Sequence, residues 1–152
     1  MRLLVLNGPN LNRLGLREPH VYGAGSLDDR EAGLRAAFPD GAFDFAQTNH
    51  EGEMIDRLHA AATDGTDGVA MNPGGLAHTS VALRDAVASI APLPVVEVHV
   101  TNVHAREPFR HTLLSAGACV GVISGLGRAG YALAVRFLLD WQSGPQTGGG
   151  TA

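Results

Sequence analysis

Short apolar runs recur along the chain, and each is bounded by glycine, proline or polar residues. They cover residues 3–6, 42–47, 68–71, 94–98 and 120–123. Runs this short are typical of strands that are buried on both faces. The second run alternates polar and apolar residues and is the weakest of the set. The pattern predicts five strands.

Apolar residues at helical spacing occupy the stretches between these runs. The sets are Leu27, Glu31, Leu34 and Phe38; Met54, Ile55, Leu58 and Ala62; Leu83, Ala86, Val87 and Ile90; and Tyr131, Ala134, Val135 and Leu138, with Trp141 further on. Each spacing gives a helix one apolar stripe. Repeated strand–helix alternation predicts an α/β fold with a parallel sheet covered by helices on both faces. For 152 residues we expect a flavodoxin-like, doubly wound, five-stranded sheet of order 2-1-3-4-5.

The chain length fits a single domain, which we expect over residues 1–142. Residues 143–152 are small, polar and rich in glycine, and we expect them to form a disordered tail. The connection over residues 8–26 is too long for an ordinary strand–helix loop, which favours a functional lid.

Charge and residue usage exclude several classes of function. The net charge of −4, from 11 basic and 15 acidic residues, leaves no chain-wide basic surface for nucleic acid. No apolar run approaches the ~20 residues that cross a bilayer, and no signal-peptide pattern follows Met1. We therefore expect a cytoplasmic protein without nucleic-acid or membrane partners. All 11 basic residues are arginine, which excludes lysine Schiff bases and P-loop lysines, and the single Cys119 excludes a disulfide within the chain.

Polar residues gather where the first and third predicted strands end. Asn7 and Asn10 follow the first strand, and Asn72, Gly74 and Gly75 follow the third. In sheets of this order, ligands bind beyond the carboxyl ends of the strands where the strand order reverses. Amides and exposed glycine backbone suit a hydroxylated or anionic small ligand. Asparagines at strand ends are also common turn formers, so both interpretations stay open here.

Three polar residues interrupt the fourth apolar run with a period of two. Glu97, His99 and Thr101 alternate with valines, which places the polar side chains on one face of the strand. A carboxylate two residues from an imidazole on the same face can orient the ring for general acid catalysis. A buried structural pair is the alternative, and the position at the catalytic edge favours function.

Two other patterns carry little weight. His99, His104 and His111 do not have the spacing of a zinc site, so we expect no metal. Residues 125–130 match G-x-G-x-x-G between a strand and a helix, but no further strand with an acidic residue follows. Close strand–helix packing explains these glycines better than a dinucleotide site does.

A tyrosine in the expected lid is the candidate base. Tyr22 follows Arg17 by five residues and Arg13 by nine. A free phenol has a pKa of about 10, so a base at pH 7 needs neighbouring guanidinium groups and a closed lid to lower that pKa. Taken alone, these residues favour an ordinary tyrosine in an exposed loop.

Ordered motifs over nearly the whole chain resemble the type II 3-dehydroquinate dehydratases. The matching segments are residues 7–12 (NGPNLN), 14–15 (LG), 17–19 (REP), 22–23 (YG), 47–53 (QTNHEGE), 72–75 (NPGG), 78–86 (HTSVALRDA) and 97–107 (EVHVTNVHARE). The resemblance implies a flavodoxin-like lyase without cofactor or metal. It also implies a homododecamer that is built as a tetramer of trimers. Its reaction is the anti elimination of water from 3-dehydroquinate through an enolate, giving 3-dehydroshikimate in the shikimate pathway.

The resemblance also implies a role for each matching residue. Tyr22 is the base, Arg17 lowers its pKa, Asn10 holds a water at the enolate oxygen, and His99 protonates the leaving hydroxyl. Glu97 orients His99, and Arg106 is a second charge near the base. Substrate hydroxyls are bound by Asn72, His78 and Arg110, the carboxylate by Val100 and Thr101, and Asp85 reaches a neighbouring subunit.

Some positions depart from the family pattern, and other classes of function remain as alternatives. Thr101 replaces a common serine, Leu76-Ala77 alters the pocket wall, and Ser115 lacks the proline that often follows it, which bears only on a turn. The alternatives are a flavodoxin-like binding module, such as a flavin carrier or a receiver domain, and a structural oligomer without activity. A receiver needs acidic residues where this chain has Asn7 and Asn10.

Overall fold

The parallel sheet predicted from the apolar runs is present. The computed structural model describes residues 1–14 and 25–143. Its strands are β1 (Arg2–Asn7), β2 (Ala42–Gln47), β3 (Gly68–Asn72), β4 (Val95–His99) and β5 (Gly121–Ser124). They pair in parallel in the order β2-β1-β3-β4-β5, which confirms the expected flavodoxin-like topology.

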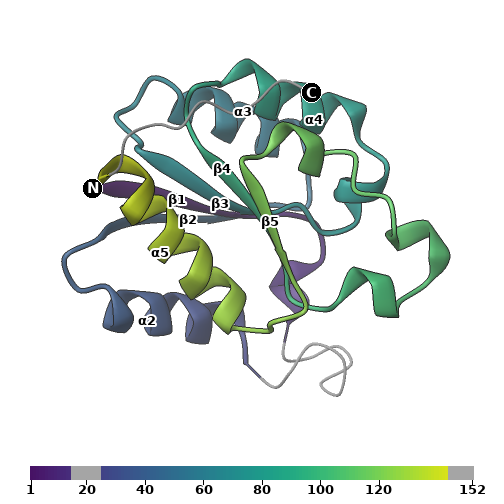
Figure 1. The fold of residues 1–152 in the computed structure, drawn as a ribbon, viewed down its shortest axis with the longest axis horizontal. Helices are drawn as coiled ribbons and strands as arrows, with labels where there is room; N and C mark the ends of the chain where they lie inside the picture. The colour runs from purple at the N-terminus through teal and green to yellow at the C-terminus, as the bar shows by residue number, and fades with distance from the viewer. Residues whose placement is uncertain (15–24, 144–152) are drawn as a thin grey trace.

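Two helices cover each face of the sheet (Figure 1). The helices α3 (Glu51–Ala61) and α4 (Val81–Ser89) lie on one face, and α2 (Leu27–Ala37) and α5 (Ala129–Ser143) lie on the other. Ser26 begins α2 with a reciprocal capping box to Asp29, and the Ser80 hydroxyl accepts the Leu83 amide at the start of α4. These polar residues satisfy amides that the first helical turn leaves unpaired.

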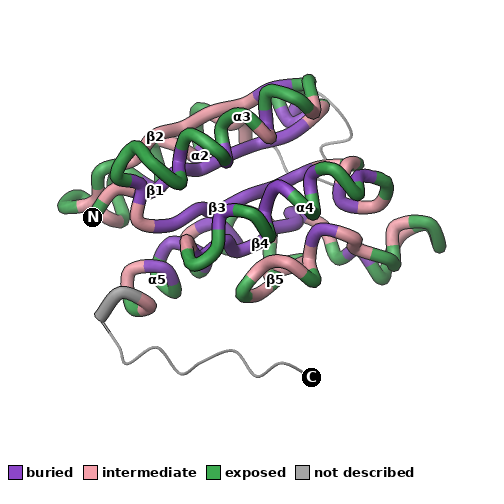
Figure 2. The backbone as a smooth tube through the Cα atoms, turned by 90° about the horizontal axis from the view of Figure 1, so that it is seen from above, coloured by how far each residue is buried: buried purple, intermediate pink, exposed green. Residues whose placement is uncertain are grey.

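The core consists of two apolar layers separated by the sheet. Alternate residues of each strand enter opposite layers, so that Leu4 packs with α3 and α4 while Leu3 packs with α2 and α5. Leu58 of α3 and Leu138 of α5 have no exposed surface. Figure 2 shows β1, β3 and β4 buried along their length, as the near-continuous apolar runs predicted.

The connections after the strands contain short 3₁₀ helices that the sequence pattern did not predict. These are η1 (Leu11–Arg13), η2 (Gly74–His78), η3 (Val103–Ala105), η4 (Pro108–Arg110) and η5 (Ala116–Ala118). Three to five residues are too few to show a hydrophobic period. Strands β4 and β5 each begin and end one residue later than predicted.

The glycine-rich segment 125–130 joins β5 to α5 by close packing, as expected. The amides of Gly125 and Gly127 donate to the carbonyl oxygens of His99 and Val100, at 3.1 and 3.0 Å. A Cβ atom on Gly130 would lie 3.3 Å from Val98 Cγ1. The turn therefore fixes the backbone that follows β4.

Other expectations concern parts of the chain that the structure does not describe. Most of the expected lid, residues 15–24, and the tail beyond Ser143 lie outside the described residues, and the single-domain boundary at residue 142 stays a prediction. Within residues 1–14 and 25–143, no helix combines the length and apolar character that spanning a membrane demands.

Candidate active site

Two glycines allow the loops that follow β1 and β3 to approach each other closely. The Gly8 amide donates to the Asn72 carbonyl oxygen at 2.8 Å, and a Cβ atom on Gly8 would lie 2.7 Å from Pro73 O. Gly74 has a φ of +59°, and its Cβ would lie 2.9 Å from Pro9 O. At both positions only glycine leaves room for the backbone of the opposite loop, and at Gly74 only glycine adopts the left-handed backbone at low cost. The two loops therefore form the floor of a cleft at the carboxyl edge of the sheet.

A cleft of about 120 Å³ opens at this edge, where the order of the strands reverses. Eight of the predicted site residues line it: Asn10, Asn72, His78, His99, Val100, Thr101, Arg106 and Arg110. Arg13, which was not assigned a site role, also lines the cleft. Three of the lining residues are thus arginines, which makes the cleft suitable for an anionic ligand.

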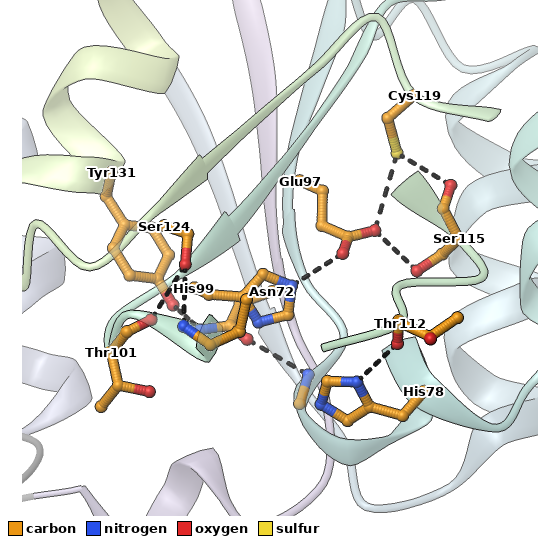
Figure 3. Close-up of polar contacts among 12 residues, drawn as sticks. Asn72, His78, Glu97, His99, Thr101, Thr112, Ser115, Cys119, Ser124 and Tyr131 are labelled. Carbon is orange, nitrogen blue, oxygen red and sulfur yellow. Dashed lines mark hydrogen bonds and ion pairs between the residues drawn. The ribbon is translucent and has the colours of Figure 1, made fainter. Parts of the chain in front are cut away.

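A buried polar chain stands behind the cleft at β4 (Figure 3). Glu97 Oε1 lies 2.7 Å from His99 Nε2, and Glu97 Oε2 accepts the Ser115 hydroxyl at 2.6 Å. Glu97 and Ser115 have no exposed surface, and His99 is 6% exposed. The predicted period of two therefore brings the carboxylate and the imidazole together.

Cys119 lies at the edge of this polar chain. Its Sγ atom is 3.9 Å from Glu97 Oε2, and it also donates to the Ser115 carbonyl oxygen at 3.5 Å. Burial, together with the nearby Glu97 carboxylate, raises the pKa of the Cys119 thiol to about 12. The thiol is therefore neutral and unreactive at physiological pH.

His78 lies beside His99 in the cleft. Its ring is stacked against that of His99, with centroids 6.2 Å apart and planes inclined by 26°. Its Nδ1 atom lies 2.9 Å from the Thr112 carbonyl oxygen, so Nε2 is the ring nitrogen left for a ligand. The role of His78 as a substrate-binding residue stays a prediction.

Asn72 is fixed by a second buried network. Its Nδ2 atom donates to the Tyr131 hydroxyl at 2.9 Å, and that hydroxyl donates to Asn7 Oδ1 at 2.6 Å. The Gly74 amide donates to Asn72 Oδ1 at 3.1 Å. Because the tyrosine proton goes to Asn7, Asn72 must present its amino group to Tyr131. The orientation of the Asn72 amide is thereby determined.

Two of the arginines that line the cleft, Arg106 and Arg110, come from the connection after β4. Arg106 Nη1 donates to the Thr101 hydroxyl at 3.3 Å, and Arg106 and Arg110 both pair with Glu107, at 3.5 and 2.8 Å. Backbone hydrogen bonding and the Arg110 guanidinium lower the pKa of the Glu107 carboxyl. The Ser124 hydroxyl holds the Thr101 carbonyl oxygen at 3.1 Å.

Of the other predicted site residues, Asn10 lines the cleft, Asp85 does not, and two lie outside the described chain. Asn10 adopts a left-handed conformation with a φ of 69°, and its amide donates to Asn49 Oδ1 at 2.9 Å. Asp85 is exposed on α4, pairs with Arg84, and does not line the cleft within the described chain. Arg17 and Tyr22 lie outside the described residues, so their roles stay predictions.

Sequence reasoning missed the residues that support the site from behind. Ser115 was interpreted only as part of a turn, and Tyr131 only as a helix core residue. Both contact residues at least 18 positions away along the chain, so no local spacing points to them. The one available signal was the polar character of a serine and a phenol among apolar neighbours.

The arrangement suits proton transfer to and from an anionic small molecule. Across the described ranges, no group of three or more histidine, cysteine, aspartate or glutamate side chains is placed to hold a metal ion. A parallel sheet with a carboxylate–histidine pair at its carboxyl edge, facing an arginine-lined cleft, defines a flavodoxin-like α/β enzyme of the acid–base type.

Comparison with known proteins identifies the family. The family model for dehydroquinase class II matches residues 1–139. A 3-dehydroquinate dehydratase 2 of Corynebacterium efficiens is 58% identical over 144 residues (92% of this chain and 98% of the relative), and a 3-dehydroquinate dehydratase of Janthinobacterium sp. is 54% identical over 139 residues (90% and 95%). A crystal structure of type II dehydroquinase from Butyrivibrio crossotus superposes with a TM-score of 0.89 at 40% identity, covering 91% of this chain and 97% of that one. The chain belongs to the class II dehydroquinase family.

Proposed function

We propose that the protein is a hydro-lyase that dehydrates 3-dehydroquinate to 3-dehydroshikimate, a step of the shikimate pathway. The observation that carries this proposal is the buried Glu97–His99 pair at an arginine-lined cleft, in a chain of the class II dehydroquinase family. The relatives described above are named for this dehydration. The alternative of a binding module without catalysis is not favoured.

The acid half of the reaction belongs to His99. Glu97 engages Nε2 at 2.7 Å, so the proton delivered to a substrate leaves from Nδ1. The leaving hydroxyl takes this proton as its C–O bond breaks, and it departs as water with the bonding electron pair. The ionised Glu97 stabilises the imidazolium before transfer and holds the ring in one orientation.

The base half is assigned to Tyr22. The tyrosinate takes the proton from the carbon beside the ketone, and the electron pair moves onto the carbonyl oxygen to form the enolate. A water held by Asn10 donates to that oxygen, and Arg17 and Arg106 stabilise the tyrosinate. When the enolate collapses, its electrons form the new C=C bond and expel the hydroxyl that His99 protonates. The proton is removed from one face of the ring and the hydroxyl leaves from the opposite face, so the elimination is anti.

The rest of the cleft positions the substrate. The Val100 and Thr101 backbone and the Thr101 hydroxyl are assigned to the substrate carboxylate. Asn72, His78 and Arg110 are assigned to its hydroxyl groups. The lining of the cleft by all five residues supports these roles, since each can reach a ligand bound there. No cofactor or metal takes part in this mechanism.

The assembly is proposed to be a cytoplasmic homododecamer, a tetramer of trimers. In it Asp85 reaches the cleft of a neighbouring subunit, which its exposed position on α4 allows. Light scattering of the purified protein should give a mass about twelve times that of one chain. A monomer with full activity would contradict both the assembly and the role of Asp85.

Activity is tested by adding 3-dehydroquinate to the purified protein and following the absorbance of the conjugated enone product. Turnover without added metal or cofactor, unchanged by a chelator, is expected. No product at any pH between about 5 and 9 would contradict the proposed function.

A further inference from the structure

Ser115 places its side chain on a catalytic carboxylate rather than on its own helix. It occupies the N-cap position of η5, where a serine hydroxyl commonly accepts a backbone amide. Within the described residues its hydroxyl makes no such cap and donates instead to Glu97 Oε2 at 2.6 Å. A merely local role in the turn does not explain the hydrogen bond to Glu97.

The segment that carries Ser115 is anchored to the site at several points. The Leu114 amide donates to the Ala77 carbonyl oxygen at 2.7 Å, next to His78, and the Thr112 carbonyl oxygen contacts the His78 ring. The Ala118 amide donates to the Ser115 carbonyl oxygen at 3.0 Å. The Ser115 hydroxyl is therefore fixed relative to both histidines.

The Ser115 hydroxyl affects the charge of the pair as well as its geometry. A carboxylate with no exposed surface needs a donor on each oxygen, and Glu97 has His99 on Oε1 and Ser115 on Oε2. A donor on Oε2 favours the ionised carboxylate and thus the imidazolium opposite it. Among the described residues, the other titratable groups in contact with the pair are His78, whose ring is stacked on His99, and Cys119, which stays a neutral thiol.

We propose that Ser115 is a positioning residue of the proton donor: by donating to Glu97 Oε2 it keeps Glu97 aligned and ionised, and through Glu97 it keeps His99 charged and oriented toward the substrate. The proposal rests on the proposed function, because it assigns the Glu97–His99 pair to the acid step.

The test is the pH profile of kcat for Ser115→Ala. We expect kcat to fall about tenfold with little change in KM, since a hydrogen bond to a charged group is lost. The basic limb of the profile should also move by about one pH unit to lower pH, because the imidazolium loses part of its counter-charge.

Cys119→Ala is the matched control, since it removes a weaker contact to the same carboxylate oxygen. The Cys119 Sγ atom lies 3.9 Å from Glu97 Oε2, against 2.6 Å for the Ser115 hydroxyl. We expect its basic limb to stay at the wild-type pH. Ser115→Cys keeps a weak donor in place and should give an intermediate shift.

The outcomes separate the two claims. A wild-type protein that does not convert 3-dehydroquinate would remove the proposed function itself. A wild-type protein that turns over, with an unmoved basic limb in Ser115→Ala, would overturn the positioning role alone. Should Ser115→Ala not fold, Ser115→Gly, which also removes the hydroxyl donor, decides: a basic limb identical to wild type rejects the role of Ser115.

Discussion

At the scale of single residues, the site depends on a charge that is buried together with its partners. Glu97 is fully buried yet makes hydrogen bonds through both oxygens, which makes its ionised form tolerable inside the protein. The proposed acid step uses that charge, while folding needs only the hydrogen bonds. Substitutions that keep the bonds and remove the charge should therefore affect rate and stability differently.

Glu97→Gln makes this separation measurable. Glutamine accepts from His99 through its oxygen and donates to Ser115 through its amino group, so the buried bonds remain paired. We expect kcat to fall by at least about tenfold, while the free energy of unfolding changes by less than about 1 kcal/mol. Steady-state kinetics and urea unfolding measure the two quantities. Glu31→Gln, which removes a partly exposed carboxylate on α2, is the control and should leave kcat unchanged.

Contacts between single residues could be predicted only where the two partners lie close together along the chain. Glu97 and His99 could be predicted because they lie two residues apart on one strand. The contact between Ser115 and Glu97 spans 18 residues, and that between Asn7 and Tyr131 spans 124. Such contacts depend on how the connections after the strands fold over the edge of the sheet. The hydrophobic periodicity of the sequence does not predict that arrangement.

At the scale of elements, the strand ends determine the shape of the cleft. The loops after β1 and β3 approach so closely that a side chain at Gly8 or Gly74 would meet backbone atoms of the opposite loop. Strands β1, β3 and β4 could be predicted because runs buried on both faces are continuously apolar, whereas the edge strands β2 and β5 are only partly buried and β2 has a weaker, alternating pattern. The 3₁₀ helices that carry His78 and Arg110 could not, because five and three residues are too few to show a repeating hydrophobic pattern.

Gly74→Ala tests the approach of the two loops. The new Cβ would lie 2.9 Å from Pro9 O in a left-handed backbone, so we expect the free energy of unfolding to fall by about 1–3 kcal/mol. Gly75→Ala is a control one residue away, because its Cβ would meet nothing within 4 Å. Equal urea midpoints for the two variants would show that the loops do not constrain residue 74.

At the scale of the whole molecule, a buried phenol and a partly buried thiol make stability depend on alkaline pH. Burial raises the pKa of the Tyr131 hydroxyl from 10.0 to about 12, and burial beside Glu97 raises that of Cys119 from 9.0 to about 12. The unfolded chain releases these protons at a lower pH than the folded protein does. The folded state is therefore favoured fully below pH 9 and loses this contribution as the pH rises toward 12.

Urea unfolding at pH 8, 9.5 and 11 measures this dependence. We expect the free energy of unfolding to be highest at pH 8 and to fall at each step. Tyr131→Phe and Cys119→Ala should each flatten the decline relative to the wild type. A wild-type stability that is the same at pH 8 and pH 11 would contradict the burial of both groups.

The assembly is the feature of the whole molecule that a single chain predicts least. Asp85 lies on an exposed helix surface, and nothing in its own spacing distinguishes it from any solvated acidic residue. Its proposed role follows from the family motif at residues 78–86, and within the described residues it does not line the cleft.

The most direct test of the mechanism compares kcat for the wild type and Tyr22→Phe, with the affinity for a ring-flattened carbocyclic substrate analogue measured in parallel. Removal of the base should lower kcat by about 10²–10⁴-fold, the usual contribution of a general base, while the analogue binds both proteins with similar affinity. A phenylalanine variant that dehydrates 3-dehydroquinate at the wild-type rate would show that Tyr22 does not take the proton.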